Sequence, residues 1–229
     1  YDTISGGLSI KQTYSSSQLI AFGDIAVSPW GDVYVTYAAG FDNGYDRLAK
    51  VNTTTWAFDW VQDLGGWNDQ VNALEFIGSD LYGVTGGGID AYVLKFGLSD
   101  GGASVTNLGK IGKNSDGDLS LDPMTGQVYY TSWESTTSQL NTLDLSIPSE
   151  TFVNFISPSN GWAGLAFSPD GTLWAGNYWQ NNLYTLDPAT GIATLFSGLP
   201  GVGSVTGLSY SPVPEPATLT LLGLGIASL

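Results

Sequence analysis

Three short segments combine tryptophan or tyrosine with amide or carboxylate side chains, a combination suited to binding sugars. Aromatic rings stack on the faces of a sugar ring, while amides and carboxylates hydrogen-bond its hydroxyl groups. Large rings also serve to fill the space between packed structural units, and that interpretation stays open for each tryptophan. The candidate binding residues are Trp67, Asn68, Asp69, Trp162, Tyr178, Trp179, Gln180 and Asn181.

A second kind of chemistry, glycoside hydrolysis, needs two carboxylates and no histidine. Glu75 is the outside candidate for catalysis, because it interrupts the apolar stretch 72–77. A buried carboxylate there must be paired or must have a raised pKa. Strand alternation places Glu75 on the opposite face from its neighbours Leu74 and Phe76, so an exposed or channel-lining position is the simpler prediction. The acids on the corresponding stretches, Asp24, Asp118 and Asp122, do not match its position.

A third candidate is a calcium loop, since Asn114, Asp116 and Asp118 stand at alternate positions. In the usual loop a glycine follows the acids and a glutamate closes the pattern. Here Gly117 falls between the acids and no glutamate follows. These residues are therefore weak metal candidates, a turn with solvated carboxylates is favoured, and we expect no cofactor unless calcium binds here.

The composition of the 229 residues removes several classes of chemistry. The chain contains no cysteine and no histidine, which excludes thiol nucleophiles, imidazole bases and the usual zinc ligand sets. The 21 acidic and six basic residues leave a formal charge of −15, and such a surface repels nucleic-acid phosphates. Neutral sugars, cations and basic partners remain open.

The elements that must position these residues follow a repeat. Each unit has an alternating apolar stretch, a glycine-containing turn, a second stretch with one aromatic residue, and two further short stretches. The units begin at 24–37, 71–85, 118–132 and 165–177. Their aromatic residues, Tyr34, Tyr82, Tyr129 and Trp174, recur about every 45 residues, a period typical of propeller blades.

The repeat predicts an all-β fold, a β-propeller of four-stranded blades over residues 1–212, in preference to a sandwich. Segment 205–212 matches the first stretch of a unit, and residues 1–15 match the end of one. We therefore expect a composite fifth blade closed by pairing of N- and C-terminal strands, which hides the sheet edges. Six blades stay possible, because part of the composite blade is expected upstream of Tyr1.

The blade pattern also predicts where the candidate residues gather. Turns at the two ends of a strand lie at opposite ends of an antiparallel sheet. Loops between second and third strands therefore share one face with the loops between blades, and we expect a binding mouth on that face. Trp67, Trp162 and Trp179 all fall in such loops.

The end of the chain, 213–229, differs from the rest. It begins with Val213, Pro214, Glu215, Pro216 and Ala217 and continues as an uncharged apolar run. This segment resembles the PEP-CTERM sorting signal of exported bacterial proteins, except that it stops before the basic cluster of that signal. The visible run is shorter than the roughly 20 residues that span a bilayer, so a final buried strand is the alternative interpretation.

The resemblance implies a destination. Proteins with this signal are exported by Gram-negative-type bacteria, held transiently in the inner membrane by the tail and processed by an exosortase. They reach the cell surface or the extracellular matrix, commonly in species that make exopolysaccharide. We accordingly expect a surface or matrix protein whose propeller binds polysaccharide or protein without catalysis. The alternatives are a secreted carbohydrate-active enzyme and a self-assembling structural protein.

Overall fold

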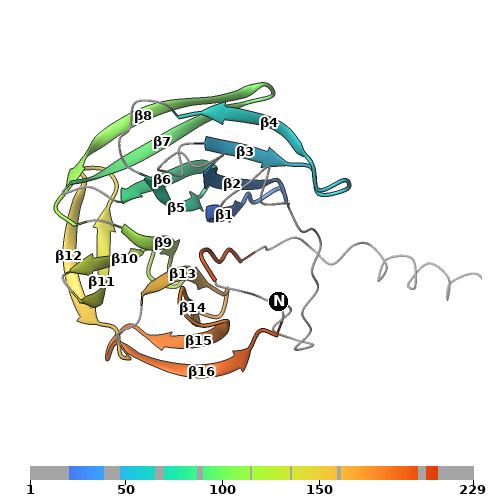
Figure 1. Ribbon diagram of the computed structural model, residues 1–229. Coiled ribbons are helices and arrows are strands. Elements are labelled where there is room, and N and C mark those ends of the chain that lie inside the picture. Colours follow the sequence, from blue (N-terminus) through green and yellow to red (C-terminus); the bar gives the residue numbers. More distant parts are fainter. Residues whose placement is uncertain are drawn as a thin grey trace, which may run out of the picture.

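The structure, a computed structural model, describes residues 21–38, 47–64, 70–86, 90–113, 115–134, 136–158, 161–200 and 205–210. These residues form four antiparallel sheets of four strands, each sheet ordered as in the chain. The sheets stand around a common axis like the blades of a propeller (Figure 1), as the repeat predicts. Among the described residues, no helix is long and apolar enough to cross a membrane.

Each blade starts at the axis and ends at the periphery. Blade 1 contains β1 (Ala21–Val27), β2 (Val33–Ala38), β3 (Arg47–Val51) and β4 (Phe58–Asp63). Blade 2 contains β5 (Gln70–Ile77), β6 (Asp80–Gly86), β7 (Ala91–Ser99) and β8 (Gly102–Ile111). Blade 3 contains β9 (Ser115–Leu121), β10 (Val128–Glu134), β11 (Thr137–Asp144) and β12 (Ser149–Phe155). Blade 4 contains β13 (Trp162–Phe167), β14 (Leu173–Asn177), β15 (Asn182–Asp187) and β16 (Ile192–Gly198).

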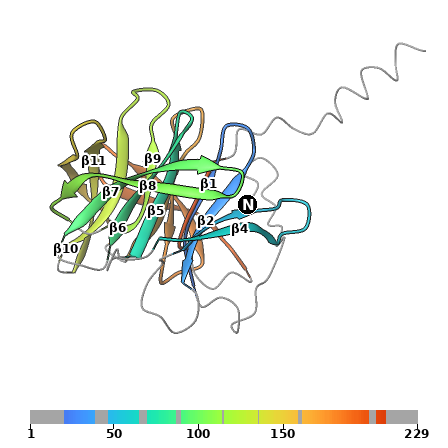
Figure 2. The same cartoon turned by 90° about the horizontal axis from the view of Figure 1, so that it is seen from above.

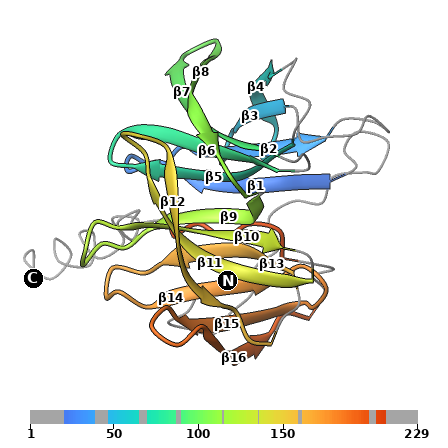
Figure 3. The same cartoon turned by 90° about the vertical axis from the view of Figure 1, so that its left-hand side faces the viewer.

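The inner strands β1, β5, β9 and β13 are neighbours around the axis, and Figure 3 shows β1, β5 and β9 side by side. Burial falls from the axis outward: every residue of β13 is buried, whereas β4 alternates between half-buried and exposed. Seen from above, the outer strand β8 crosses the direction of β5 (Figure 2), because strand twist accumulates across each blade.

Two of the four recurring aromatic residues pack between neighbouring blades. Tyr34 on β2 packs against Phe76 of blade 2, with ring centroids 5.6 Å apart. Tyr129 on β10 makes the equivalent contact with Phe167 of blade 4, also at 5.6 Å. Tyr34 and Tyr129 thus fill equivalent wedges between blades, whereas Trp174 packs against Phe196 within its own blade.

The turns that follow β1 and β13 depend on glycine. Gly31 and Gly171 have φ angles of 93° and 84°, values that favour residues without a Cβ. Each glycine N–H donates to the carbonyl of a serine three residues earlier, at 2.9 Å in both turns. A proline follows that serine in both turns and presets the backbone. These turns close the end of the axis where the pocket described below is found.

Segment 205–210 occupies the inner ring between blades 4 and 1 (Figure 1). A strand was predicted here, but the structure assigns none, so the described residues show four blades rather than five or six. The segment is held by side-chain contacts: a Cβ on Gly176 would come within 2.2 Å of Val205, and one on Gly164 within 2.9 Å of Leu208. Residues 1–20, predicted to complete the composite blade, lie outside the described residues.

Candidate functional site

The inner strands carry three acidic residues close to the axis, namely Asp24 on β1, Glu75 on β5 and Asp118 on β9. Asp24 and Asp118 are 2% and 0% exposed. Each lies beside a β-bulge, where its strand shifts register against the next strand of the blade. The shift leaves the aspartate N–H opposite a threonine hydroxyl, Thr36 at 3.0 Å or Thr131 at 3.4 Å. The bulge turns each carboxyl group toward the neighbouring blade.

The carboxyl groups of Asp24 and Asp118 join blades through backbone amides. Asp24 accepts from the N–H of Ile25 at 2.7 Å and from that of Leu74 in blade 2 at 2.6 Å. The Asp118 carboxylate accepts three such bonds, from the N–H groups of Leu119 at 2.7 Å, Leu165 of blade 4 at 2.6 Å and Leu208 of segment 205–210 at 3.1 Å. Buried N–H groups at the axis are thus satisfied by these two side chains.

Asp24 and Asp118 also hydrogen-bond each other. Burial raises the pKa of both groups, and the neighbouring charge of Asp118 raises the pKa of Asp24 further. Asp118 already receives three backbone N–H groups, so it is the better acceptor. We therefore expect the two groups to share one proton, with Asp24 as its donor and Asp118 as its acceptor.

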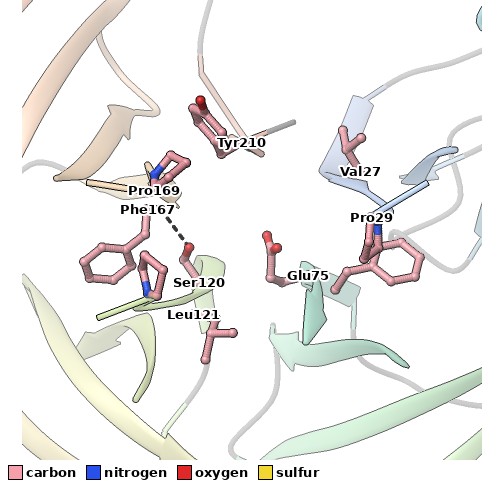
Figure 4. Close-up of a pocket in the computed structure, with 10 residues that line it drawn as sticks. Val27, Pro29, Glu75, Ser120, Leu121, Phe167, Pro169 and Tyr210 are labelled. Carbon is pink, nitrogen blue, oxygen red and sulfur yellow. Dashed lines mark hydrogen bonds between the residues drawn. The ribbon is translucent and has the colours of Figure 1, made fainter. Parts of the chain in front are cut away.

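Glu75 belongs to a different environment, a pocket of about 190 Å³ at one end of the axis (Figure 4). Its side chain projects from β5 into the pocket, as the strand alternation predicts. Burial raises the pKa of Glu75 well above its usual value, the charge of Asp118 adds to this, and a hydrogen bond from the Phe76 N–H opposes it. The remaining walls are mostly apolar: Val27, Pro29, Phe76, Ser120, Leu121, Pro123, Phe167, Pro169 and Tyr210.

The pocket lies at the opposite end of the axis from the predicted mouth. Pro29, Pro123 and Pro169 belong to turns between first and second strands. The described candidates Tyr178, Trp179, Gln180 and Asn181 belong instead to the turn between β14 and β15, at the other end of blade 4. Sequence reasoning found Glu75 but not the pocket around it, because the prolines were interpreted only as turn formers.

Trp162, one of the predicted sugar-binding residues, is fully buried. Its indole Nε1–H donates to the carbonyl of Pro158 at 2.9 Å, and its ring meets Tyr184 edge-on at 4.9 Å. The prediction for this residue was therefore wrong: the ring fills the interior between blades 3 and 4 and offers no face to a ligand.

Tyr178 and Trp179 are in contrast exposed, by 40% and 73%. They form the turn between β14 and β15 and meet edge to face, with centroids 4.7 Å apart. The Trp179 N–H donates to Asn177 Oδ1 at 2.9 Å and the Tyr178 N–H to the Gly161 carbonyl at 2.9 Å. A Cβ on Gly161 would meet the indole at 2.9 Å, so the glycine lets the ring lie against the backbone.

The amides beside this aromatic pair are partly committed to the fold. Gln180 Oε1 accepts hydrogen bonds from the Tyr184 hydroxyl at 2.5 Å and from Asn182 at 3.4 Å. Asn181 donates to the Leu199 carbonyl at 3.4 Å. These bonds fix the orientation of the two side chains. The Gln180 amide N–H and the Asn181 Oδ1 are left to hydrogen-bond a ligand.

Several predicted residues lie outside the described residues: Trp67, Asn68, Asp69, Asn114 and the sorting-signal residues Val213, Pro214, Glu215, Pro216 and Ala217. The side chain of Asp116 is likewise not described. Asp118, the third calcium candidate, has its carboxylate engaged by backbone amides rather than free in a turn. Among the described residues, no three carboxylate groups are arranged to hold a metal ion.

Sequence reasoning missed the structural role of Asp24 and Asp118. A signal was present: both occupy the same repeat position, and both units carry a threonine, Thr36 or Thr131, at the matching position of the second strand. The other two units have Ala73 and Gly164 in place of the aspartate.

Comparison with known proteins finds no protein family and no curated protein that matches the chain. Solved structures do resemble it. A Bacteroides thetaiotaomicron protein of unknown function superposes with a TM-score of 0.57 at 14% identity, over 81% of this chain and 45% of the other. A gluconolactonase from Xanthomonas campestris gives 0.54 at 11% identity, over 83% and 66%. A chain of the nidogen/laminin complex gives 0.53 at 14%, over 86% and 70%.

The chain therefore spans less than half the length of the first of these proteins and about two thirds of the others. They include a gluconolactonase and a chain of the nidogen/laminin complex, so the shared architecture occurs in proteins of different function. At such low identity the likeness shows the fold alone: the chain is a β-propeller.

Proposed function

We propose that this propeller is a non-catalytic binding module whose ligand is a neutral polysaccharide, held on the Tyr178–Trp179 turn. The observation that carries the proposal is an indole that is 73% exposed and yet fixed in place. Two adjoining exposed rings, Tyr178 and Trp179, offer faces on which a sugar ring can stack. Because the Trp179 backbone is already hydrogen-bonded and its ring abuts Gly161, stacking on a sugar sacrifices little conformational entropy.

The surroundings of Trp179 supply the polar half of sugar recognition. Gln180 and Asn181 stand beside the ring, with amide groups that match ring hydroxyls. The formal charge of −15 disfavours an anionic polymer. A neutral glycan fits both features.

The experiment measures binding of soluble neutral polysaccharides by the full chain, by glycan array and then by calorimetry. We expect Trp179→Ala to weaken binding at least about tenfold, equivalent to about 1.4 kcal/mol. The matched control is Trp30→Ala, since Trp30 is 58% exposed but lies on a turn at the other end of blade 1. Equal binding by the Trp179 variant, or an equal loss in the Trp30 variant, would refute the proposal.

Glycoside hydrolysis at Glu75 is less well supported. Two carboxyl groups must flank the scissile bond, and Glu75 is the one carboxyl group among the residues that line the described pocket. The Asp118 carboxylate is engaged by three backbone N–H groups.

We also propose a fifth blade position, with segment 205–210 as its inner element. Its support is the set of contacts to both neighbouring blades, including a hydrogen bond of 3.0 Å from the Val27 N–H to the Ser209 hydroxyl. The proposed destination is the surface or matrix of an exopolysaccharide-producing bacterium, after exosortase processing. It is supported by the likeness of 213–229 to a PEP-CTERM signal and agrees with a polysaccharide ligand.

A further inference from the structure

The axial pocket contains a carboxyl group without a side-chain partner. Among the described residues, no ion pair or side-chain hydrogen bond engages Glu75, and the backbone N–H of Phe76 is the one group that lowers its pKa. Figure 4 shows its oxygens directed into the open space of the pocket, with Ser120 to one side and Pro29 to the other. No hydrogen bond joins Glu75 to Ser120, whose hydroxyl oxygen accepts the Phe167 N–H at 2.9 Å.

The electrostatic surroundings of Glu75 are negative. The residues that line the pocket include no lysine or arginine. The titratable side chains that the structure describes on the surrounding inner elements are Asp24 on β1, Asp118 on β9 and Tyr210 in segment 205–210, and β13 contributes none. The turns that carry Pro29, Pro123 and Pro169 add Asp32, Asp122 and Asp170, of which Asp32 pairs with Lys50. The pocket therefore disfavours anions, and a ligand that brings positive charge relieves the burial of the carboxyl group.

The walls fit the apolar part of such a ligand. The ring of Tyr210 lies at the rim, where its π face attracts a cation. Phe76 and Phe167 contribute apolar surface to the walls, while their rings pack against Tyr34 and Tyr129 between the blades. Pro29, Pro123 and Pro169 add rigid apolar surface at the rim. At about 190 Å³ the pocket is smaller than the roughly 300 Å³ or more typical of sites for drug-sized ligands. It suits one short aliphatic chain with a charged end.

We propose that the axial pocket binds an aliphatic ammonium group, with Glu75 as its counter-ion and the aromatic and proline side chains around its methylene chain. The source is a small free amine or the side chain of a lysine in another molecule. This site lies at the opposite end of the axis from Trp179, so it is independent of the polysaccharide proposal. A failure of Trp179 to bind polysaccharide would therefore leave the ammonium-site proposal standing.

Binding of the ammonium group is linked to the charge of Glu75. The pKa of Glu75 is raised in the free protein and must fall when a cation sits beside it. Affinity therefore increases as pH rises through the pKa of the free protein. Below that pH, binding releases a proton, which calorimetry detects as a dependence of the measured heat on the buffer's ionisation enthalpy.

The test titrates the full chain with n-butylammonium, with 1-butanol as the neutral probe of the same chain length. We expect saturable binding of the ammonium and at least about tenfold weaker binding of the alcohol. Glu75→Gln should weaken ammonium binding by a similar factor, whereas Trp179→Ala should leave it unchanged. Equal binding of both probes, or undiminished binding by a folded Glu75→Gln protein, would overturn the proposal.

A second variant avoids reliance on Glu75 alone. Tyr210 is 41% exposed at the rim, so Tyr210→Ala should fold and should weaken ammonium binding severalfold by removing a ring. An unchanged affinity here contradicts the assigned role of the walls. A blocked glycine–lysine–glycine peptide distinguishes the sources: binding as tight as that of butylammonium identifies a lysine side chain, and tighter binding of the free amine identifies a small molecule.

Discussion

The inner strands of blades 1 and 3 differ instructively from that of blade 2. All three carry an acid near the axis. In blades 1 and 3 the acid stands beside a bulge, where backbone N–H groups of two blades converge on it. In blade 2 the bulge position is Ala73, and the acid, Glu75, comes two residues later.

Register explains the different fates of these acids. Glu75 is paired across its sheet with Tyr82, the recurring aromatic residue of blade 2. In the other blades the residue paired with the recurring aromatic is small: Ala26, Ser120 or Ala166. Glu75 is therefore the one large side chain in a layer of small ones. An acid surrounded by backbone donors supports the fold, whereas an acid surrounded by small and apolar side chains is left open to a ligand.

The largest effect should come from removing the acceptor capacity of Asp118. Asp118→Asn leaves one oxygen for three backbone N–H groups, so the free energy of unfolding should fall by about 3 kcal/mol. Urea denaturation at neutral pH measures it. Asp24→Asn is the matched control and should cost only about 1 kcal/mol, because its amide can still donate to Asp118. Equal losses in the two variants would show that the proton is not held by Asp24.

The dependence of stability on pH should be intermediate in size. The pKa values of Asp24, Asp118 and Glu75 are raised in the folded state. Their contribution to stability is present below about pH 4 and is lost as pH rises through the folded values, because the unfolded chain has already released these protons. Each independently titrating group gives a slope of up to about 1.4 kcal/mol per pH unit.

Glu75→Gln isolates its part of that slope. Urea denaturation between pH 4 and pH 8 should show a flatter decline in the variant than in the parent protein. Parallel curves would mean that Glu75 titrates normally and that the pocket does not desolvate it.

The smallest effect should come from breaking an ion pair at the surface. Lys50 contacts Asp32 at 2.8 Å, with side chains 27% and 32% exposed. Lys50→Met keeps the aliphatic stem and removes the charge, so it should lower the free energy of unfolding by less than about 1 kcal/mol. The loss should shrink further in 1 M NaCl, where such a pair is screened. A cost comparable with that of Asp118→Asn would erase the distinction between axial and peripheral carboxylates.

The sequence was sufficient to predict four-stranded propeller blades, but not their number or the contacts at the axis. The spacing of Tyr34 and Tyr129 predicted the sheets correctly, because each ring fills the same wedge. The burial of Trp162 could not be read from its loop-like surroundings, since tertiary packing decides it. The contact between Asp24 and Asp118 depends on bulges, whose one trace in the sequence is the aspartate and threonine that recur at matching positions of two units. Segment 205–210 has a strand's alternation but meets side chains instead of a paired backbone.

The alternation of bulge residues has a consequence for protein engineering. Aspartate with threonine occurs in blades 1 and 3, while blades 2 and 4 carry Ala73 and Gly164 where the aspartate would be. An artificial ring built by copying one aspartate-bearing blade would crowd its centre with like charges. The transferable module is a pair of adjacent blades, one that supplies the acceptor and one that supplies the amide.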